Sequence, residues 1–308
     1  MIVMWRIDTH CNLACGFCAF DRRLPLPRVR VSEDTALQTI DRLAAVGTPV
    51  HLSWLGGEPT LWPPLAQVSA YAKSRGLRVS LTTNGTRMVA MREVLLSLDE
   101  VTISLDLPDA GHDLLRGWSG GSRRVLDGIA ALARQRVNTL LRANVVLMRS
   151  TIAAFPALCR ALAAAGIDEI TFNALGGRDR PEFHASESLL PAQLTAFAAA
   201  LPHCREEIER AGARLIGTDA YVRRLINAAA GIPQPISDCG PGRDLVFIDE
   251  YGRMAPCAYT ADTYGLPLHA LETQSALAEY WTAAQRERRS AACEDCPSTQ
   301  LAGKFAFS

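Results

Sequence analysis

The sequence predicts an α/β protein built on a parallel sheet, and two observations carry that prediction. Short apolar runs rich in β-forming residues alternate with amphipathic runs of helical periodicity up to about residue 175. A glycine follows several of the helical runs, as Gly47, Gly76 and Gly166 do, where a helix turns back into a strand. Six such β/α repeats predict a parallel sheet that is either curved into a barrel or part-barrel, or doubly wound. In both arrangements the chemistry lies on loops beyond the carboxyl ends of the strands.

The expected strands and helices alternate in order along this region. The strand segments are rich in Val, Ile, Thr and aromatic residues, and they cover residues 3–7, 50–55, 78–83, 101–107, 139–148 and 169–174. The helical segments repeat apolar residues every three or four positions, and they lie near 32–46, 64–75, 87–98, 120–136 and 151–165.

The pattern divides the chain into three regions: the β/α repeats at 1–175, a helical linker region at 176–235 and a small C-terminal domain at 236–308. The linker region opens with a polar stretch, GGRDRPEFHASES, and continues with helix candidates at 190–212 and 218–230.

The C-terminal region begins with a two-strand unit, LVFIDEYGRMAPC, whose turn is expected at Glu250, Tyr251 and Gly252. A helix near 268–289 then leads to the pair Cys293 and Cys296.

Composition limits the function classes. The chain has 308 residues, of which 48% are hydrophobic and 21% charged, so it is neither disordered nor collagen-like. Lys+Arg and Asp+Glu are both 32, and a net charge of zero disfavours electrostatic binding of nucleic acid. An 18-residue apolar run is absent, and the N-terminus is too short and polar for a signal peptide. We therefore expect a soluble, cytoplasmic protein with no membrane partner.

Nine cysteines without an export signal favour metal binding or catalysis over disulfides. Cys11, Cys15 and Cys18 crowd into eight residues on the loop after the first strand. Three thiolates with this spacing can surround one corner of an iron–sulfur cube, which leaves the fourth iron without a nearby protein ligand. Zinc is the alternative, but a structural zinc site takes four ligands, and His10 is awkwardly placed beside Cys11 to be the fourth.

With Phe17 as its aromatic residue, the motif CxxxCx-aromatic-C resembles the signature of the radical S-adenosylmethionine (SAM) superfamily. After the second strand comes a segment that resembles the superfamily's glycine-rich contact with the methionine amino group of SAM, formed by Gly56, Gly57, Glu58 and Pro59. Glycines let a backbone approach a ligand closely, and a carboxylate can accept hydrogen bonds from an ammonium group.

Two further turns extend the resemblance over about residues 3–175. Thr83 and Asn84 belong to a TNG turn after the third strand, and Ser104 and Asp106 follow one another on one face of the fourth strand. Leu107 stands where many relatives have glycine. The resemblance implies a partial (β/α)6 barrel in which these four polar residues contact SAM.

On the fifth strand, Arg142 and Asn144 alternate with apolar neighbours. If they point inward, Arg142 could bind the SAM carboxylate and Asn144 its ribose; an outward charge covered by helix is an equal alternative. We expect His112, Asp113 and Arg116 to fix a loop.

The resemblance also implies the chemistry. A [4Fe–4S] cluster held by Cys11, Cys15 and Cys18 binds SAM at its open iron and cleaves it reductively. The resulting 5′-deoxyadenosyl radical abstracts a hydrogen atom from the substrate, while the protein orients the reactants and excludes water. A flavodoxin or ferredoxin is the expected reductant. Residues that act as catalytic acid or base are not evident from the sequence.

Four cysteines in the last quarter of the chain predict a second site, formed by Cys239, Cys257, Cys293 and Cys296. Four converging thiolates make a closed site for zinc or a second cluster. The spacing CxnGx4C…CxxC resembles the twitch domain, a shortened SPASM domain, and implies one auxiliary [4Fe–4S] cluster. Cys159 and Cys204, in helical segments, are expected to be apolar fillers.

Three functions follow from these patterns. The leading hypothesis is a radical SAM oxidoreductase or epimerase that acts on a small polar molecule, such as an aminocyclitol or sugar, in secondary metabolism. The alternative is a maturase that crosslinks, epimerises or oxidises a ribosomal peptide; only ten residues precede Cys11, so we expect no N-terminal peptide-recognition domain. A non-catalytic metal scaffold is the third, remote hypothesis.

Overall fold

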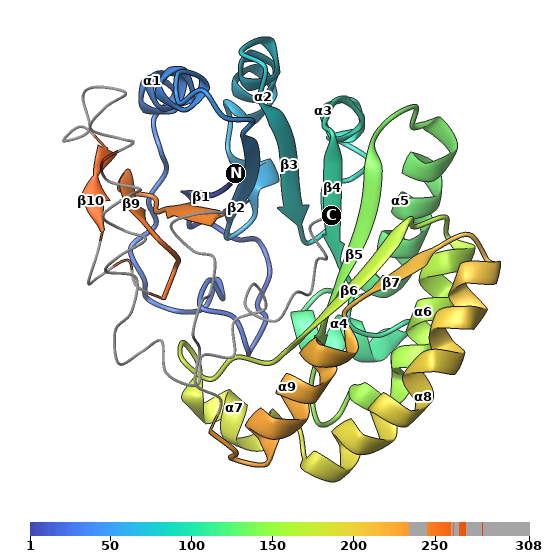
Figure 1. The fold of residues 1–308 in the computed structure, drawn as a ribbon. Coiled ribbons are helices and arrows are strands. Elements are labelled where there is room, and N and C mark those ends of the chain that lie inside the picture. Colours follow the sequence, from blue (N-terminus) through green and yellow to red (C-terminus); the bar gives the residue numbers. More distant parts are fainter. Residues whose placement is uncertain (234–244, 260, 262–264, 269–278, 280–308) are drawn as a thin grey trace.

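The computed structural model describes residues 1–233, 245–259, 261, 265–268 and 279. The strands of this part of the chain form one sheet, in the order β10-β9-β8-β1-β2-β3-β4-β5-β6-β7 (Figure 1). The strands that follow one another in the repeats are β1 (Ile2–Asp8), β2 (His51–Gly56), β3 (Arg78–Thr83), β4 (Glu100–Ser104), β5 (Leu140–Leu147), β6 (Glu169–Ala174) and β7 (Arg214–Ile216). The C-terminal strands are β8 (Leu245–Ile248), β9 (Arg253–Ala255) and β10 (Leu266–Pro267).

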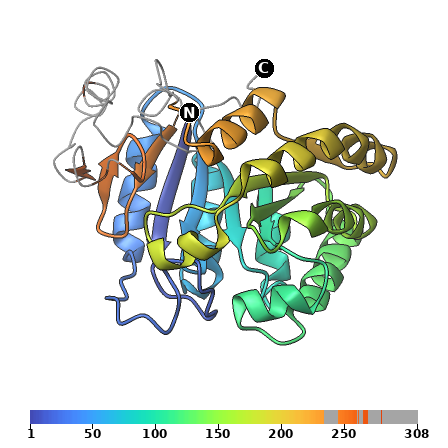
Figure 2. The same ribbon diagram turned by 90° about the horizontal axis from the view of Figure 1, so that it is seen from below.

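Helices connect the strands. They are α1 (Glu33–Ala44), α2 (Leu65–Ser74), α3 (Arg92–Ser97), α4 (Ala110–Arg116), α5 (Gly121–Gln135), α6 (Phe155–Ala164), α7 (Pro181–Glu187), α8 (Pro191–Arg210) and α9 (Asp219–Ala229), with 3-10 turns η1 (Pro59–Leu61) and η2 (Ile152–Ala154). The first seven strands are mutually parallel, and Figures 1 and 2 show them as an open, curved fan with helices along its outer side. The predicted partial barrel is confirmed.

Alternation along the strands separates the two faces of the sheet. In β1 the side chains of Val3, Trp5 and Ile7 are fully buried, because they face the helices of the outer layer. The ring centroids of Trp5 and Trp54 lie 5.6 Å apart in that layer. The intervening positions face the concave side, which carries many of the polar groups of the strands.

The six predicted strands and five predicted helices of the repeats are present, as are the two helices at 191–210 and 219–229 and the hairpin of β8 and β9. Five described elements were missed by the sequence analysis. These are η1, α4, α7 within the stretch expected to be a polar linker, β7 and β10. All five are short, so they hold too few residues to show a clear period.

The sheet continues across both predicted domain boundaries. Strand β7, inside the predicted linker region, pairs with β6, and β8, inside the predicted C-terminal domain, pairs in parallel with β1. The division at residues 175 and 235 therefore does not separate one sheet from another. Cys239, Cys293, Cys296 and nearly all of the predicted helix at 268–289 lie outside the described residues.

In the part of the chain that the structure describes, no helix is both long enough and apolar enough to cross a bilayer.

Candidate functional site

The cysteine loop leaves the carboxyl end of β1 and is fixed at its start by Asp8. The buried Asp8 carboxylate accepts hydrogen bonds from the backbone N–H of His10 at 2.7 Å and from Arg30 Nε at 2.8 Å. Farther along, Arg28 donates to the carbonyl of Thr9 at 2.7 Å and to that of Asp21 at 2.8 Å. The loop is thus held across its whole length by side chains that the sequence analysis did not single out.

Of the three thiols of the loop, Cys15 is buried and Cys11 and Cys18 are half-buried, and their surroundings supply hydrogen-bond donors. Backbone N–H groups point at two of the sulfurs, from Leu13 to Cys11 Sγ at 3.5 Å and from Phe20 to Cys18 Sγ at 3.4 Å. Amide donors stabilise thiolates and tune iron–sulfur clusters.

Burial raises the pKa of all three thiols, that of Cys15 to about 12, and the neighbouring thiols contribute to the increase at Cys15. Metal ligation would remove these protons. Among the described residues, no three His, Cys, Asp or Glu side chains converge on a single point as ligands of one ion do. Thiolates that bind three different irons of a cube need not converge, so the donor set fits a [4Fe–4S] cluster.

The glycine pair contacts the cysteine loop itself. Gly57 N–H donates to the carbonyl of Asp8 at 2.7 Å, and Glu58 N–H donates to that of His10 at 2.8 Å. A Cβ on Gly56 would collide with the carbonyl of Asp8, and one on Gly57 with the carbonyl of His10. The close approach that these glycines permit is therefore to the chain just before Cys11. Their predicted contact with SAM, and that of Pro59 at the start of η1, stays a prediction.

Glu58 joins the loop after β2 to the loop after β3. Its fully buried carboxylate accepts hydrogen bonds from Thr60 Oγ1 at 2.6 Å, from Thr83 Oγ1 at 2.7 Å and from the backbone N–H of Asn84 at 2.7 Å. Burial raises the pKa of Glu58, while these hydrogen bonds oppose the increase. These contacts give the carboxylate a positioning role between the two loops, and its expected bond to the SAM ammonium stays a prediction.

Asn84 links the same turn to the cysteine loop. Its Nδ2 donates to Asn12 Oδ1 at 3.0 Å and lies 3.8 Å from Cys11 Sγ. Its Oδ1 accepts the Thr86 backbone N–H at 2.9 Å, which fixes the direction of the amide. Hydrogen bonds therefore join four residues of the predicted site into one group, Glu58, Thr83, Asn84 and Cys11.

Asp106 and Arg116 hold the other side of the loop. Asp106 accepts from Arg116 Nη2 at 2.7 Å and from the backbone N–H of Val146 at 3.0 Å, and its predicted contact with SAM stays a prediction. Burial alone would lower the pKa of Arg116, but the charges of Asp106, Cys15 and Cys18 outweigh it and raise that pKa. The Arg116 guanidinium also lies 5.3 Å from the ring centroid of Phe17.

The polar residues of the concave face lie at two heights along the strands, one near the amino ends and one nearer the carboxyl ends. Arg142 forms ion pairs with Glu100 and Glu169, the first residues of β4 and β6, at the end of the sheet opposite the cysteine loop. The structure therefore supports a structural role for Arg142 rather than a bond to the SAM carboxylate. Asn144 pairs in register with Ser104 and accepts from Asn173 Nδ2 at 2.9 Å. The predicted contacts of Ser104 and Asn144 with SAM stay predictions.

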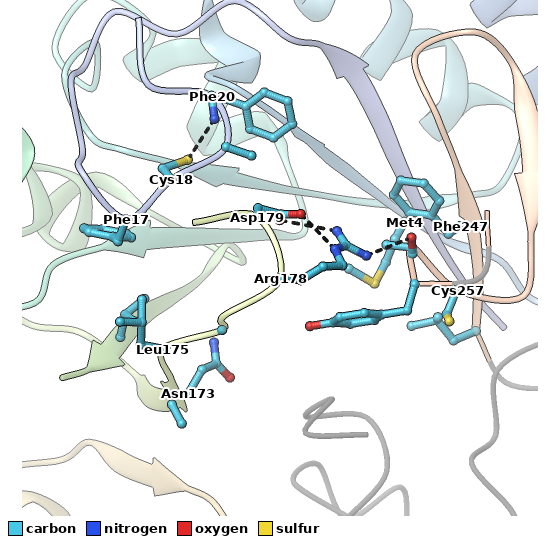
Figure 3. A pocket seen from close by; sticks show the side chains of 17 residues that line it. Met4, Phe17, Cys18, Phe20, Asn173, Leu175, Arg178, Asp179, Phe247 and Cys257 are labelled. Atoms are coloured by element: carbon cyan, nitrogen blue, oxygen red, sulfur yellow. Dashed lines mark hydrogen bonds and ion pairs between the residues drawn. The ribbon is translucent and has the colours of Figure 1, made fainter. Parts of the chain in front are cut away.

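A pocket of about 420 Å³ separates the cysteine loop from the hairpin of β8 and β9 (Figure 3). Cys18 lies on its wall on one side and Cys257, just after β9, on the other. Asn173 of β6 and Met4 of β1 line it from the sheet. The pocket therefore borders one cysteine of each predicted cluster site.

Residues 6–162 of the chain match the family described as the Radical SAM superfamily. The chain belongs to this superfamily. The Radical SAM superfamily uses a [4Fe–4S] cluster and SAM, which agrees with the thiolate loop and the predicted cofactors.

Curated relatives of this radical SAM chain include heme synthases, a coproporphyrin synthase and peptide cyclases. It is 26% identical to the AdoMet-dependent heme synthase of Methanosarcina barkeri over 84% of its own length and 76% of that protein. It is 27% identical to the PqqA peptide cyclase of Xanthomonas oryzae pv. oryzae over 97% of its own length and 80% of that protein. The chain spans only 36–43% of other heme and coproporphyrin synthases that it matches.

Solved structures share the fold. Streptococcus suis SuiB bound to S-adenosylmethionine matches 89% of this chain with a TM-score of 0.69 and 15% identity, and the match spans 64% of SuiB. The AdoMet-bound anSMEcpe matches 87% of this chain, and 77% of its own, with a TM-score of 0.65 and 19% identity. At these identities the likeness extends to the architecture alone.

Proposed function

We propose that this radical SAM enzyme modifies a peptide, by crosslinking, epimerisation or oxidation of a residue. The observation that carries the proposal is the match to a PqqA peptide cyclase, which extends over 97% of the chain and so includes the hairpin with Cys257. The activities of the curated relatives cited above include none on an aminocyclitol or sugar, so the substrate class that the sequence favoured has no support among them.

The residues of the chain have separate tasks in this reaction. Cys11, Cys15 and Cys18 would hold the [4Fe–4S] cluster, which with SAM supplies one-electron cleavage and hydrogen-atom abstraction when bound. Glu58 and Asn84 hold the loop from one side, and the Asp106–Arg116 pair and Asp8 hold it from the others. The pocket between Cys18 and Cys257 would take the reacting residue of the peptide and keep water from it.

We also propose an auxiliary [4Fe–4S] cluster bound by Cys239, Cys257, Cys293 and Cys296, able to accept an electron from the substrate. Cys257 supports this proposal, since its hairpin is anchored to β1 and it borders the pocket. A flavodoxin or ferredoxin is the proposed reductant of the first cluster.

The test uses anaerobically reconstituted enzyme with SAM, dithionite and a uniformly deuterated candidate precursor peptide. Deuterium recovered in 5′-deoxyadenosine, together with a mass change in the peptide, is expected. Cys18→Ala should abolish both signals, because it removes a thiolate of the electron donor.

A second candidate activity, a step in heme synthesis, is favoured by the match to the heme synthase over 84% of the chain. Iron-coproporphyrin III is therefore offered to the same enzyme preparation. Conversion of this porphyrin, with the peptide left unchanged, would decide against peptide modification.

A further inference from the structure

The pocket between Cys18 and Cys257 is lined by aromatic rings from three separate segments. Phe17 and Phe20 come from the cysteine loop, Phe247 from β8 and Tyr259 from the segment after the hairpin. Met4 of β1 adds a thioether, a group that packs well against rings. Figure 3 shows Phe17, Phe20 and Phe247 on different sides of the same space. Such a lining recognises an apolar group by shape and by ring contacts.

The guanidinium of Arg6 contacts two of the rings. The Arg6 guanidinium lies 5.7 Å from the ring centroid of Phe20 and 5.2 Å from that of Phe247. Glu250, at the turn of the hairpin, forms an ion pair with Arg6 and so balances its charge. Arg6 therefore ties the cysteine loop to the hairpin and holds both rings in place before a ligand arrives. A preorganised wall loses little entropy on binding.

The charged groups of the pocket compensate each other. Arg178 pairs with its neighbour Asp179 at 2.8 Å, donates to the carbonyl of Ala258 at 3.3 Å and lies 4.5 Å from the ring centroid of Tyr259. A charged substrate group would have to compete with these contacts. A neutral group with a single polar end, which can hydrogen-bond to the rim of the pocket, fits without breaking them.

We propose that this pocket holds an aromatic side chain of the peptide substrate, packed against the rings of Phe20 and Phe247 that line it. The inference rests on the proposed peptide-modifying function and names the residue class that enters the site. Tyrosine fits the arrangement well, because its ring meets the rings of the wall and its hydroxyl reaches the Arg178–Asp179 side.

The probes are N-acetyl-tyrosinamide, N-acetyl-leucinamide and N-acetyl-lysinamide, which share a backbone and differ in side chain. Each is titrated into reconstituted holoenzyme saturated with SAM, and its dissociation constant is measured by ligand-observed NMR. We expect the tyrosine probe to bind at least several-fold more tightly than the other two. Phe247→Leu should weaken binding of the tyrosine probe about two- to tenfold, the range that ring contacts contribute, and leave binding of the leucine probe nearly unchanged.

Two further variants separate recognition from folding. Phe197→Leu is the matched control, because Phe197 packs in the core against Phe155 and Phe172, away from the pocket, and it should leave tyrosine binding unchanged. Arg6→Gln should weaken binding of the tyrosine probe as Phe247→Leu does. Arg6→Lys should bind it more tightly than Arg6→Gln, because the cation is kept. Thermal unfolding of each variant checks that the fold is intact.

Equal affinity for the three probes, or a tyrosine probe that is indifferent to Phe247→Leu, would overturn the aromatic pocket. Modification of peptides that lack an aromatic residue would overturn it as well, although peptide modification itself would then stand. Selective binding of the tyrosine probe, combined with turnover of the porphyrin alone, would leave the pocket as described and reject the peptide function.

Discussion

Arg116 donates to a single carboxylate oxygen of Asp106 from two nitrogens, Nε at 2.8 Å and Nη2 at 2.7 Å. The backbone carbonyl of the same arginine accepts the N–H of Ala14, inside the cysteine loop, at 3.2 Å. Gly117, in the left-handed conformation, ends α4 against Ala14. This buried ion pair therefore connects the end of β4 to the three thiols, although neither residue is a ligand.

Removing one partner of this pair should be strongly destabilising, because it leaves an uncompensated buried charge. Arg116→Met is expected to lower the free energy of unfolding by about 3–5 kcal/mol, measured by urea denaturation. Arg116→Met/Asp106→Asn should recover part of the loss, since asparagine is neutral and can still accept from Val146 N–H. Arg123→Met, at an exposed ion pair, is the control and should change stability by less than about 1 kcal/mol. An Arg116→Met protein as stable as wild type would contradict this account.

Gly57→Ala should prevent assembly of the first cluster. The new Cβ meets the backbone carbonyl of His10, which no side-chain rotation can relieve, so the chain entering the cysteine loop must shift. We expect iron and acid-labile sulfide at the first site to fall severalfold after anaerobic reconstitution. Gly212→Asn is the matched glycine control, because nothing lies near its Cβ position and asparagine tolerates the left-handed conformation. Full cluster content in the Gly57→Ala protein would show that the loop can adapt.

Acid should destabilise the protein through His112. Burial, helped by the charge of Arg116, lowers the pKa of His112 to about 4 from an ordinary value of 6.5. Between these values the unfolded state binds more protons, so stability falls as the pH drops from about 6.5 to 4, by up to about 3 kcal/mol.

The His112→Asn variant tests this pH dependence. Its Oδ1 can replace the ring Nδ1 that accepts from Asp106 N–H, but it does not titrate. Urea denaturation across this pH window should show a flatter profile for His112→Asn than for wild type, and no such flattening for exposed His203→Asn. Parallel profiles for wild type and His112→Asn would mean that other groups carry the acid sensitivity.

Cys293→Ala/Cys296→Ala should separate the two predicted clusters. Wild-type protein is expected to hold about eight irons per chain and the variant about four, with SAM cleavage retained and little product formed. Cys159→Ala/Cys204→Ala, which alters two buried cysteines of α6 and α8, is the control and should keep its iron. A variant that aggregates and fails in both assays would indicate a purely structural site, because ligation energy contributes to folding. Normal turnover without the second cluster would remove any redox role.

Local patterns along the chain were enough to predict the repeats and the cysteine loop. The spacing of Cys11, Cys15 and Cys18, and the periods of the strands and helices, are properties of neighbouring residues and of backbone geometry. The same holds for the turn at Gly252, where a positive φ of 72° suits glycine. These features do not depend on which distant segment lies beside them.

The tertiary structure alone decided which side chains are engaged within the protein. Glu58 and Asp106 match ligand-binding positions in sequence, yet each also accepts a backbone N–H from a neighbouring strand region that the sheet brings alongside, of Asn84 just after β3 and of Val146 in β5. Arg6 and Glu250 are 244 positions apart, and they meet because β8 pairs with β1. The pocket between Cys18 and Cys257 arises in the same way, since a space enclosed by distant segments depends on strand order, which no local spacing encodes.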